Sequence, residues 1–150
     1  MNIVRLRTPP RVKVLEALGA VAGKRVKILD QNNCLVDASE GPRTYNVFVD
    51  LSSQLAQSDD NGTVFRDYVG YPIIAFLMVL GKISYDQKIA ELLASVKWRS
   101  LNERYKSYAK VESVVKDMLA KQGVKPEEVE EFVAKVLQEV EQLGLRKRVI

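Results

Sequence analysis

The stretch Arg43-Thr44-Tyr45-Asn46-Val47-Phe48-Val49-Asp50 decides the fold class of this chain. Aromatic and β-branched residues fill it, which is typical of a β-strand. Two shorter stretches of the same character precede it, at Lys24–Asp30 and Cys34–Val36, and turn-forming residues separate all three. Because strands joined by short turns pair antiparallel, these segments predict an antiparallel sheet.

A fourth strand is predicted at Thr63–Tyr68, which begins with further β-forming residues. The polar stretch Ser58–Gly62 before it has the composition of a turn or loop. Between this loop and the clearest strand, Leu51–Gln57 fits either a short helix or a loop. The predicted strands therefore all lie in the first half of the chain.

A helix is predicted ahead of the strands. Thr8 is its expected cap, and Pro9 and Pro10 occupy its first positions, where a proline loses no hydrogen bond. Apolar residues then recur on one helical face until Gly23, which is expected to end the helix. This pattern places a helix at the N-terminal end of the fold.

The second half of the chain has helical patterns. Its longest apolar run, Val69–Leu80, is too short for a bilayer span, which needs about 20 residues. It therefore predicts a buried core helix from about Pro72. Ser84 and Gln87 then have the spacing of a capping box, which predicts that the next helix begins there.

Two more helical stretches follow. One is expected from about Ser100, and it either runs on or breaks near Ser107. The other, Pro126–Leu143, repeats apolar residues at intervals of three and four, which predicts a helix that docks on its own chain. Any exposed remainder of its apolar face is a candidate dimer seam. The last stretch, Leu145–Ile150, is either a basic tail or an added strand.

These segments predict an α+β fold, because strands cluster before helices instead of alternating with them. The expected order is an N-terminal helix, a three- to four-stranded antiparallel sheet, and then about four helices packed on one face. The length predicts a single domain over 1–150. Its β-rich half is expected at about 1–68 and its helical half at about 69–150.

The chain contains no histidine and a single cysteine, Cys34. Histidine is the usual proton carrier near pH 7 and the commonest metal-ligating side chain. Its absence excludes histidine-based catalytic triads and zinc sites that contain histidine. We therefore expect no metal and no cofactor, and we favour a binding protein over an enzyme. An enzyme that uses Asp, Lys or Tyr is the least favoured hypothesis.

Charge is distributed in blocks along the chain. The net charge is +4, and residues 97–123 carry seven basic against three acidic side chains. Aromatic residues interleave with these cations, and this composition suits RNA or single-stranded DNA. Two cations of the first predicted strand are expected to join that surface. The predicted nucleic-acid-binding residues are Trp98, Arg99, Arg104, Tyr105, Lys106, Lys110, Arg25 and Lys27.

A simpler interpretation exists for the same residues. Trp98, Leu101, Tyr105 and Tyr108 also lie at helical spacing, and aromatic residues so spaced usually belong to the core. The cations would then form the solvated face of that helix. We favour this interpretation, because the electrostatic pattern is present without any nucleic-acid-binding motif.

The first functional hypothesis is therefore a non-catalytic binding or assembly module that acts through protein contacts, including a homodimer. A nucleic-acid-binding accessory protein is the alternative. A lone cysteine and a short, charged N-terminal stretch predict a cytoplasmic protein without membrane insertion. The abundance of Val, Glu, Lys and Arg suggests a thermophile origin, against which the glutamines and asparagines count.

Overall fold

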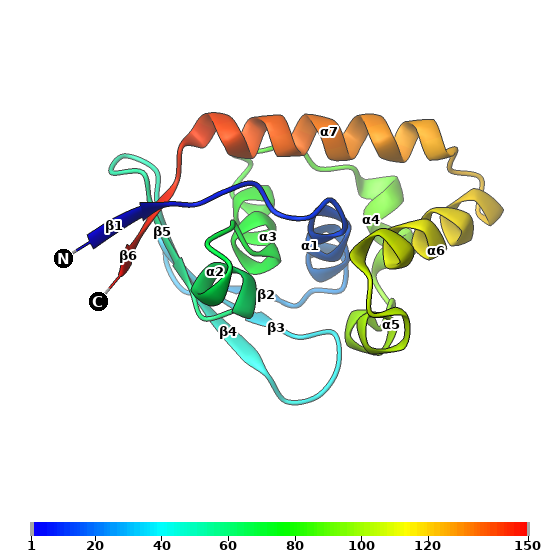
Figure 1. The fold of residues 1–150 in the computed structure, drawn as a ribbon, viewed down its shortest axis with the longest axis horizontal. Helices are drawn as coiled ribbons and strands as arrows, with labels where there is room; N and C mark the ends of the chain where they lie inside the picture. Colours follow the sequence, from blue (N-terminus) through cyan, green and yellow to red (C-terminus); the bar gives the residue numbers. More distant parts are fainter. Residues whose placement is uncertain (1, 150) are drawn as a thin grey trace.

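A six-stranded mixed sheet lies at one side of the molecule, as seen in the computed structural model, which describes residues 2–149 (Figure 1). The strand order across the sheet is β1-β6-β5-β4-β3-β2. The predicted strand around Val47 is β4, in the interior of the sheet. The strands are β1 (Asn2–Arg5), β2 (Val26–Ile28), β3 (Asn33–Asp37), β4 (Thr44–Asp50), β5 (Leu55–Ser58) and β6 (Arg146–Val149).

Four consecutive strands, β2 to β5, pair antiparallel, as the short turns between them predict. Val36 pairs with Tyr45 and Cys34 with Val47. Cys34, Val36, Val47 and Val49 are all buried, because alternate residues of a strand point to the same face. This face carries the sheet's contribution to the core.

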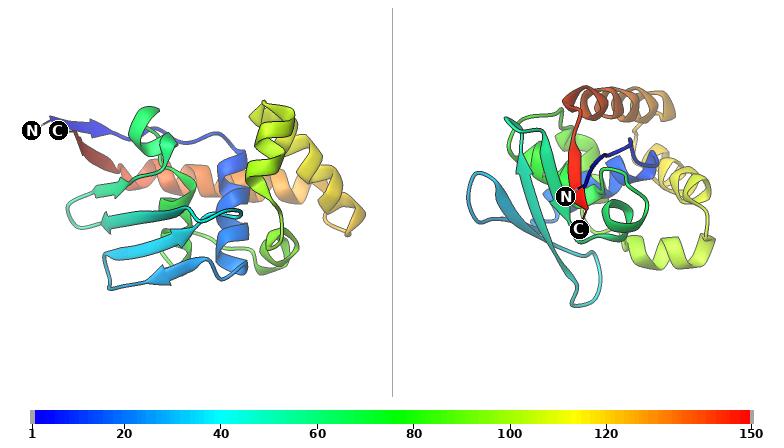
Figure 2. Two further views of the ribbon diagram at one scale, coloured as in Figure 1. Left: turned by 90° about the horizontal axis from the view of Figure 1, so that it is seen from below. Right: turned by 60° about the vertical axis from the view of Figure 1, so that its left-hand side comes forward.

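Seven helices accompany the sheet within residues 2–149. Helices α1 and α3 lie between the sheet and α7, which runs along the outside of the molecule (Figures 1 and 2). Helix α3 is buried from Pro72 to Met78, as its apolar run predicts. The helices are α1 (Val12–Ala22), α2 (Asn61–Phe65), α3 (Tyr71–Val79), α4 (Gln87–Leu93), α5 (Trp98–Tyr105), α6 (Tyr108–Lys121) and α7 (Pro126–Leu143).

The predicted arrangement of elements was wrong, although the α+β class was right. The described chain begins with strand β1 and not with a helix, and the sheet has six strands in mixed orientation instead of three or four antiparallel ones. Seven helices replace the expected five or so, which were one N-terminal helix and about four after the sheet. Strand β1 pairs antiparallel with β6 (Asn2 with Val149), and β6 pairs parallel with β5 (Leu55 with Arg146). Pairing between the two ends of a chain leaves no local sequence signal.

The predicted strand at Thr63–Tyr68 was also wrong. Helix α2 occupies the first half of this stretch, and the strand before it lies at Leu55–Ser58, where a helix or loop was expected. Asp60 caps α2: its carboxylate accepts hydrogen bonds from the backbone N–H of Thr63 at 3.0 Å and from its hydroxyl at 2.8 Å. A capped helix start therefore overrides the β propensity of the residues that follow it.

Some helix boundaries agree with the prediction, whereas α5 begins at Trp98, two residues before the expected Ser100. The chain breaks at Ser107, whose hydroxyl accepts a hydrogen bond from the backbone N–H of Lys110, and α7 has the predicted bounds. Two predicted caps were wrong. Asp86 caps α4 in place of Ser84, and α1 begins at Val12 without a side-chain cap in place of a start at Thr8.

The C-terminal stretch Leu145–Ile150, which was expected to be a basic tail or a strand, contains strand β6. Lys147 of this strand binds helix α2. This lysine is buried, and its Nζ donates to the backbone oxygens of Thr63 at 2.6 Å and Val64 at 3.0 Å. It also pairs with Asp67 at 2.6 Å. Lysine side chains commonly bind the free carbonyls at the end of a helix. Helix α2 is thereby held at a fixed position beside the sheet.

Helix α7 docks on its own chain, as its pattern predicts. Val129, Val133, Val136 and Val140 are buried and belong to the core, so this face is not free for a second chain. Among the described residues, no helix is both long enough and apolar enough to cross a membrane.

Candidate functional site

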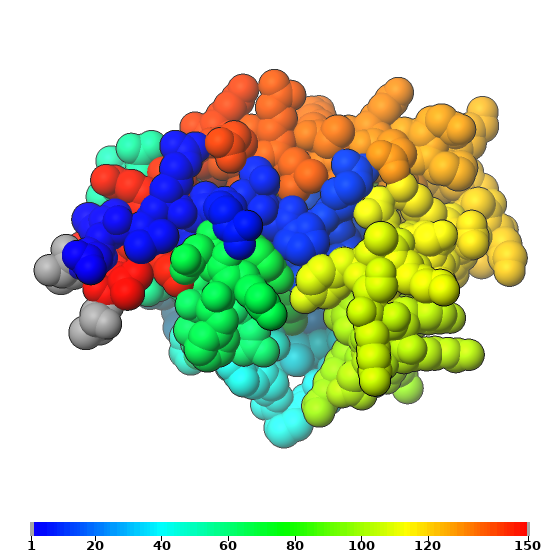
Figure 3. Space-filling view, viewed as in Figure 1, coloured from blue at the N-terminus to red at the C-terminus, as the bar shows by residue number. Residues whose placement is uncertain are grey.

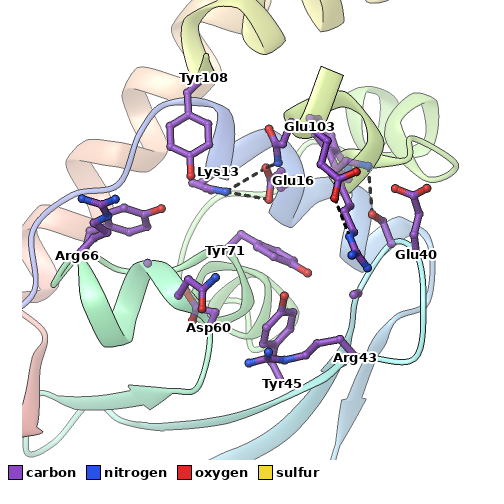
Figure 4. A pocket seen from close by; sticks show the side chains of 18 residues that line it. Lys13, Glu16, Glu40, Arg43, Tyr45, Asp60, Arg66, Tyr71, Glu103 and Tyr108 are labelled. Carbon is purple, nitrogen blue, oxygen red and sulfur yellow. Dashed lines mark hydrogen bonds and ion pairs between the residues drawn. The ribbon is translucent and has the colours of Figure 1, made fainter. Parts of the chain in front are cut away.

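A cleft of about 670 Å³ opens between α1, α2, the corner joining α5 to α6, and the β3–β4 loop (Figures 3 and 4). Most of its lining side chains are polar, aromatic or charged. The lining residues are Lys13, Glu16, Ala38, Ser39, Glu40, Arg43, Tyr45, Asp60, Asn61, Gly62, Arg66, Tyr68, Tyr71, Trp98, Arg99, Asn102, Glu103 and Tyr108.

An ion pair lies at the inner wall of this cleft. Lys13 and Glu16 are one turn apart on α1, and the lysine Nζ is 3.2 Å from the Glu16 carboxylate. Both side chains are largely buried, with 11% of Lys13 and 3% of Glu16 exposed. Asn102 donates a further hydrogen bond to Glu16 from α5, at 3.3 Å. The carboxylate therefore links two helices that meet at the cleft.

Lys13 is held in its charged form. Burial by itself lowers the pKa of Lys13, but the carboxylate of Glu16 and the nearby Tyr108 outweigh burial and raise this pKa. The lysine Nζ also lies 4.6 Å from the ring centroid of Tyr108, a cation–π contact. A lysine that stays protonated serves as a fixed positive charge and not as a nucleophile.

Tyrosine rings form the middle of the cleft. Tyr45 and Tyr71 meet edge to face, with centroids 5.9 Å apart and planes at 83°. Burial raises the pKa of the Tyr45, Tyr68 and Tyr71 phenols, so all three stay neutral and can donate a hydrogen bond at pH 7. Tyr45 and Tyr71 lie together in Figure 4, below the Lys13–Glu16 pair.

The other carboxylates of the cleft bind groups of the protein itself. Asp60 caps α2 through Thr63, and Glu40 accepts hydrogen bonds from the backbone N–H and hydroxyl of Ser100 at the start of α5, at 2.8 and 2.6 Å. These bonds from Ser100 lower the pKa of Glu40. Glu103 pairs with Arg99 at 3.1 Å. Each carboxylate of the lining thus already has a structural partner.

Two guanidinium groups of the lining have no carboxylate partner within residues 2–149. Arg43 donates only to the backbone oxygen of Asp59, at 2.9 Å, and its Cζ lies 5.0 Å from the centroid of Tyr45. The side chain of Arg66, at the end of α2, makes no hydrogen bond or ion pair with the described residues. Both residues are exposed, and Figure 4 shows Arg43 beside Tyr45 and Arg66 at the end of α2. They leave the cleft able to accept an anion.

The structure brings only some of the predicted site residues together. Arg99 and Trp98 both line the cleft. Arg99 is exposed, whereas Trp98 is 3% exposed and its indole nitrogen lies near Gly19 of α1. Tyr105 is half-buried against the core, with Arg104 beside its ring. Lys106 and Lys110 are exposed at the α5–α6 corner, next to the cleft.

The two predicted cations of the first strand region lie outside the cleft lining. Arg25 donates to the backbone oxygen of Asp37 at 2.8 Å, and Lys27 pairs with the Asp37 carboxylate at 2.9 Å. The hydrogen bond from Lys27 is the main cause of a lowered Asp37 pKa. These side chains brace strands β2 and β3 against each other.

Sequence reasoning missed most of the cleft. The residues come from three separate segments with no shared motif, namely Lys13 and Glu16, Arg43 and Tyr45, and Arg66. One signal was available, because α1 is otherwise apolar on its buried side and Glu16 interrupts that face three residues after Lys13. A carboxylate in such a position requires a partner, since a buried unpaired charge is costly.

Gly62 sets the position of one cleft wall, and its replacement by alanine is expected to destabilise the protein. A Cβ at this buried position would lie 2.1 Å from Cε1 of Tyr68, so the ring must move. We expect Gly62→Ala to lower the free energy of unfolding by about 1–3 kcal/mol, the usual cost of overpacking, as measured by urea denaturation. The exposed neighbour Asn61→Ala is the control, with a change of about 0.5 kcal/mol or less. Equal stability of the two variants would contradict this packing.

Cofactor-binding features do not stand out in the cleft. No group of three or more Asp, Glu, Cys or His side chains able to hold a metal is present in the described part of the chain. The single cysteine, Cys34, is buried in β3, and burial raises its pKa to about 12, so the thiol stays protonated. The chemistry offered by the lining is therefore that of tyrosine hydroxyls, guanidinium groups and one buried ion pair.

Comparison with known proteins gives a family and nothing more specific. No curated protein and no solved structure matches the chain. A family model described as uncharacterised conserved protein UCP014422 matches residues 6–146. Because this match spans nearly the whole sequence, the chain belongs to the UCP014422 family of uncharacterised conserved proteins.

Proposed function

We propose that this chain is a non-catalytic binding protein whose cleft takes a small anionic ligand with a planar ring, such as a nucleotide. One observation carries the proposal: every carboxylate of the cleft is engaged by the protein, while Arg43 and Arg66 have no carboxylate partner among the described residues. The formal charges of the lining balance, with four cations and four carboxylates, so what the cleft offers an anion is two guanidinium groups that no carboxylate occupies.

Guanidinium groups suit this role, since they bind phosphate and carboxylate in a bidentate manner. The two arginines belong to different elements. Arg43 is the last residue of the β3–β4 loop, and Arg66 follows the end of α2. A ligand between them would lie over the Tyr45 and Tyr71 rings. A cleft of about 670 Å³ has the volume of ordinary small-molecule sites.

The state of the ionisable groups supports binding over conversion. Lys13 is kept charged by Glu16, and the buried phenols of Tyr68 and Tyr71 have raised pKa values. A general base near pH 7 requires a group that gives and takes a proton in that range. The lining supplies hydrogen-bond donors and fixed charges, which bind and orient a ligand without exchanging a proton with it.

The assembly module predicted from the sequence is a second candidate. Helix α2 exposes Phe65 (75%) and Val64 (43%), and an exposed apolar pair of this kind is a possible protein contact. Light scattering discriminates this candidate, because self-association through α2 would make the particle size depend on concentration.

Removal of either unpaired arginine is expected to weaken ligand binding. Calorimetric titration with the four ribonucleoside monophosphates should give binding to the unmodified protein. Arg43→Gln and Arg66→Gln should each weaken it by about tenfold, the cost of one hydrogen bond to a charged group. Arg104→Gln is the matched control, because Arg104 is exposed on α5 but does not line the cleft.

Separate titrations measure how much each part of the nucleotide contributes to the affinity. Ribose 5-phosphate reports on the phosphate, and uridine reports on the base. The proposal requires that both parts of the nucleotide contribute. If no monophosphate binds, or if the two arginine variants bind as the unmodified protein does, the proposal is wrong.

A further inference from the structure

The α5–α6 corner, residues 97–110, is strongly basic and borders the cleft, although Arg99 is the one of its cations that lines the cleft. Its cations are all exposed and outnumber one carboxylate, that of Glu103, by five to one. Glu103 pairs with Arg99 at 3.1 Å, but both side chains are 69% exposed, so this pair is weak and open to competition by a phosphate. The five cations are Lys97, Arg99, Arg104, Lys106 and Lys110.

The same corner presents an aromatic ring at the rim of the cleft. Tyr108 begins α6, is 44% exposed, and lies between Lys106 and Lys110 in the sequence. In Figure 4 its ring reaches down from α6 toward Lys13. A ring that is exposed and flanked by cations has the composition of a base-stacking platform, because bases stack on aromatic faces while lysines neutralise phosphates.

An exposed ring and a cation are also neighbours in sequence on α2, at the other side of the cleft. Phe65 is 75% exposed and lies outside the cleft lining, and the next residue is Arg66, whose side chain lines the cleft. An exposed ring therefore lies beside the cleft at α2 as well as at α6. The hollow between α2 and the α5–α6 corner is visible in Figure 3.

We propose that the cleft binds a single-stranded nucleic acid, with one nucleotide inside the cleft and its neighbours stacked on Phe65 and Tyr108. This inference rests on the proposed function, and it names the ligand as a polymer. The proposal depends on charge complementarity. The phosphates that follow a nucleotide in the cleft would meet the exposed cations of the α5–α6 corner. Bases must be unpaired to stack on protein rings, so a single strand is favoured over a duplex.

Fluorescence anisotropy with labelled oligothymidylate and oligouridylate of about 12 nucleotides tests the inference. At low salt these strands should bind about tenfold or more tighter than the nucleoside monophosphates. Phe65→Ala and Tyr108→Ala should each weaken strand binding by about tenfold. Tyr85→Ala is the aromatic control, because Tyr85 is 38% exposed but belongs to neither α2 nor residues 97–110.

Salt dependence gives a second readout. Strand affinity should fall steeply with salt, and the Lys106→Gln/Lys110→Gln double variant should reduce the slope of log affinity against log salt by about 1.4, as two lost phosphate contacts predict for single strands. Lys125→Gln/Lys135→Gln, on the far helix α7 and its cap, should leave that slope unchanged. Thermal unfolding of each variant checks that its fold is intact.

The outcomes separate the two proposals. If the monophosphates bind through Arg43 and Arg66 but strands bind no tighter, the polymer inference is overturned and the proposed function stands. If neither binds, both fail. A duplex of equal length that binds as tightly as the single strand also overturns the inference. If no strand binds and Phe65→Ala instead abolishes self-association, the protein-contact candidate replaces it.

Discussion

Replacement of Glu16 by alanine is expected to lower the free energy of unfolding by about 3–5 kcal/mol, the cost of leaving a buried charge without its partner. The Glu16 side chain is 3% exposed, and the Lys13 side chain beside it is 11% exposed. Without the carboxylate, the Lys13 ammonium is left buried, and Asn102 loses its acceptor on α1. Urea denaturation followed by the fluorescence of Trp98, the only tryptophan, measures the change.

A double variant distinguishes charge from packing in this prediction. Lys13→Met/Glu16→Leu removes both charges and keeps apolar volume, and such replacements of a buried pair are often neutral. We therefore expect the double variant to be more stable than Glu16→Ala. Glu103→Ala breaks the exposed pair with Arg99 and serves as the control, with a change of about 1 kcal/mol or less. The interpretation of Lys13–Glu16 as a buried ion pair is wrong if Glu16→Ala matches this control.

The second large effect is expected at Phe76 in helix α3. This ring is fully buried, in a helix that lies between the sheet and the other helices. Phe76→Ala removes its apolar contacts and leaves a cavity, which costs about 3–5 kcal/mol of the free energy of unfolding. The midpoint of urea denaturation should shift accordingly while the dependence on urea concentration stays the same.

Val79 supplies the matched control on the same helix. It is 42% exposed, so Val79→Ala should change stability by about 0.5 kcal/mol or less. Tyr71 begins the same helix and lines the cleft, so a destabilised α3 also bears on ligand binding. A Phe76→Ala variant as stable as Val79→Ala would show that α3 is not the core element described here.

Local patterns predicted the elements that have a strong period of their own. The strand at Thr44–Asp50, the buried helix after Gly70 and the helix Pro126–Leu143 all follow from residues that are neighbours in the sequence. Where a cap competed with propensity, as at Asp60 before Thr63, propensity misled. The predicted single domain and cytoplasmic location stay predictions.

The predicted nucleic-acid-binding surface stays a prediction, but the structure shows that its residues differ in exposure. Lys106 and Lys110 are exposed beside the cleft, whereas Trp98 is buried against α1. Helical spacing places Trp98 and Tyr105 on a common face, but it does not say which neighbour covers that face. Tyr108 escapes burial because the chain breaks at Ser107 and begins a new helix there.

The sequence by itself determined the α+β class, the helices and strands with a clear period, and the exclusion of histidine chemistry, because each depends on residue types or on neighbours within a few positions. Only the tertiary structure decided that β1 pairs with β6, that Lys147 holds α2, and that Arg43 and Arg66 share a cleft. Those contacts join segments tens of residues apart. Their free energy comes from packing and charge pairing that exist only after the chain has folded, so no local period records them.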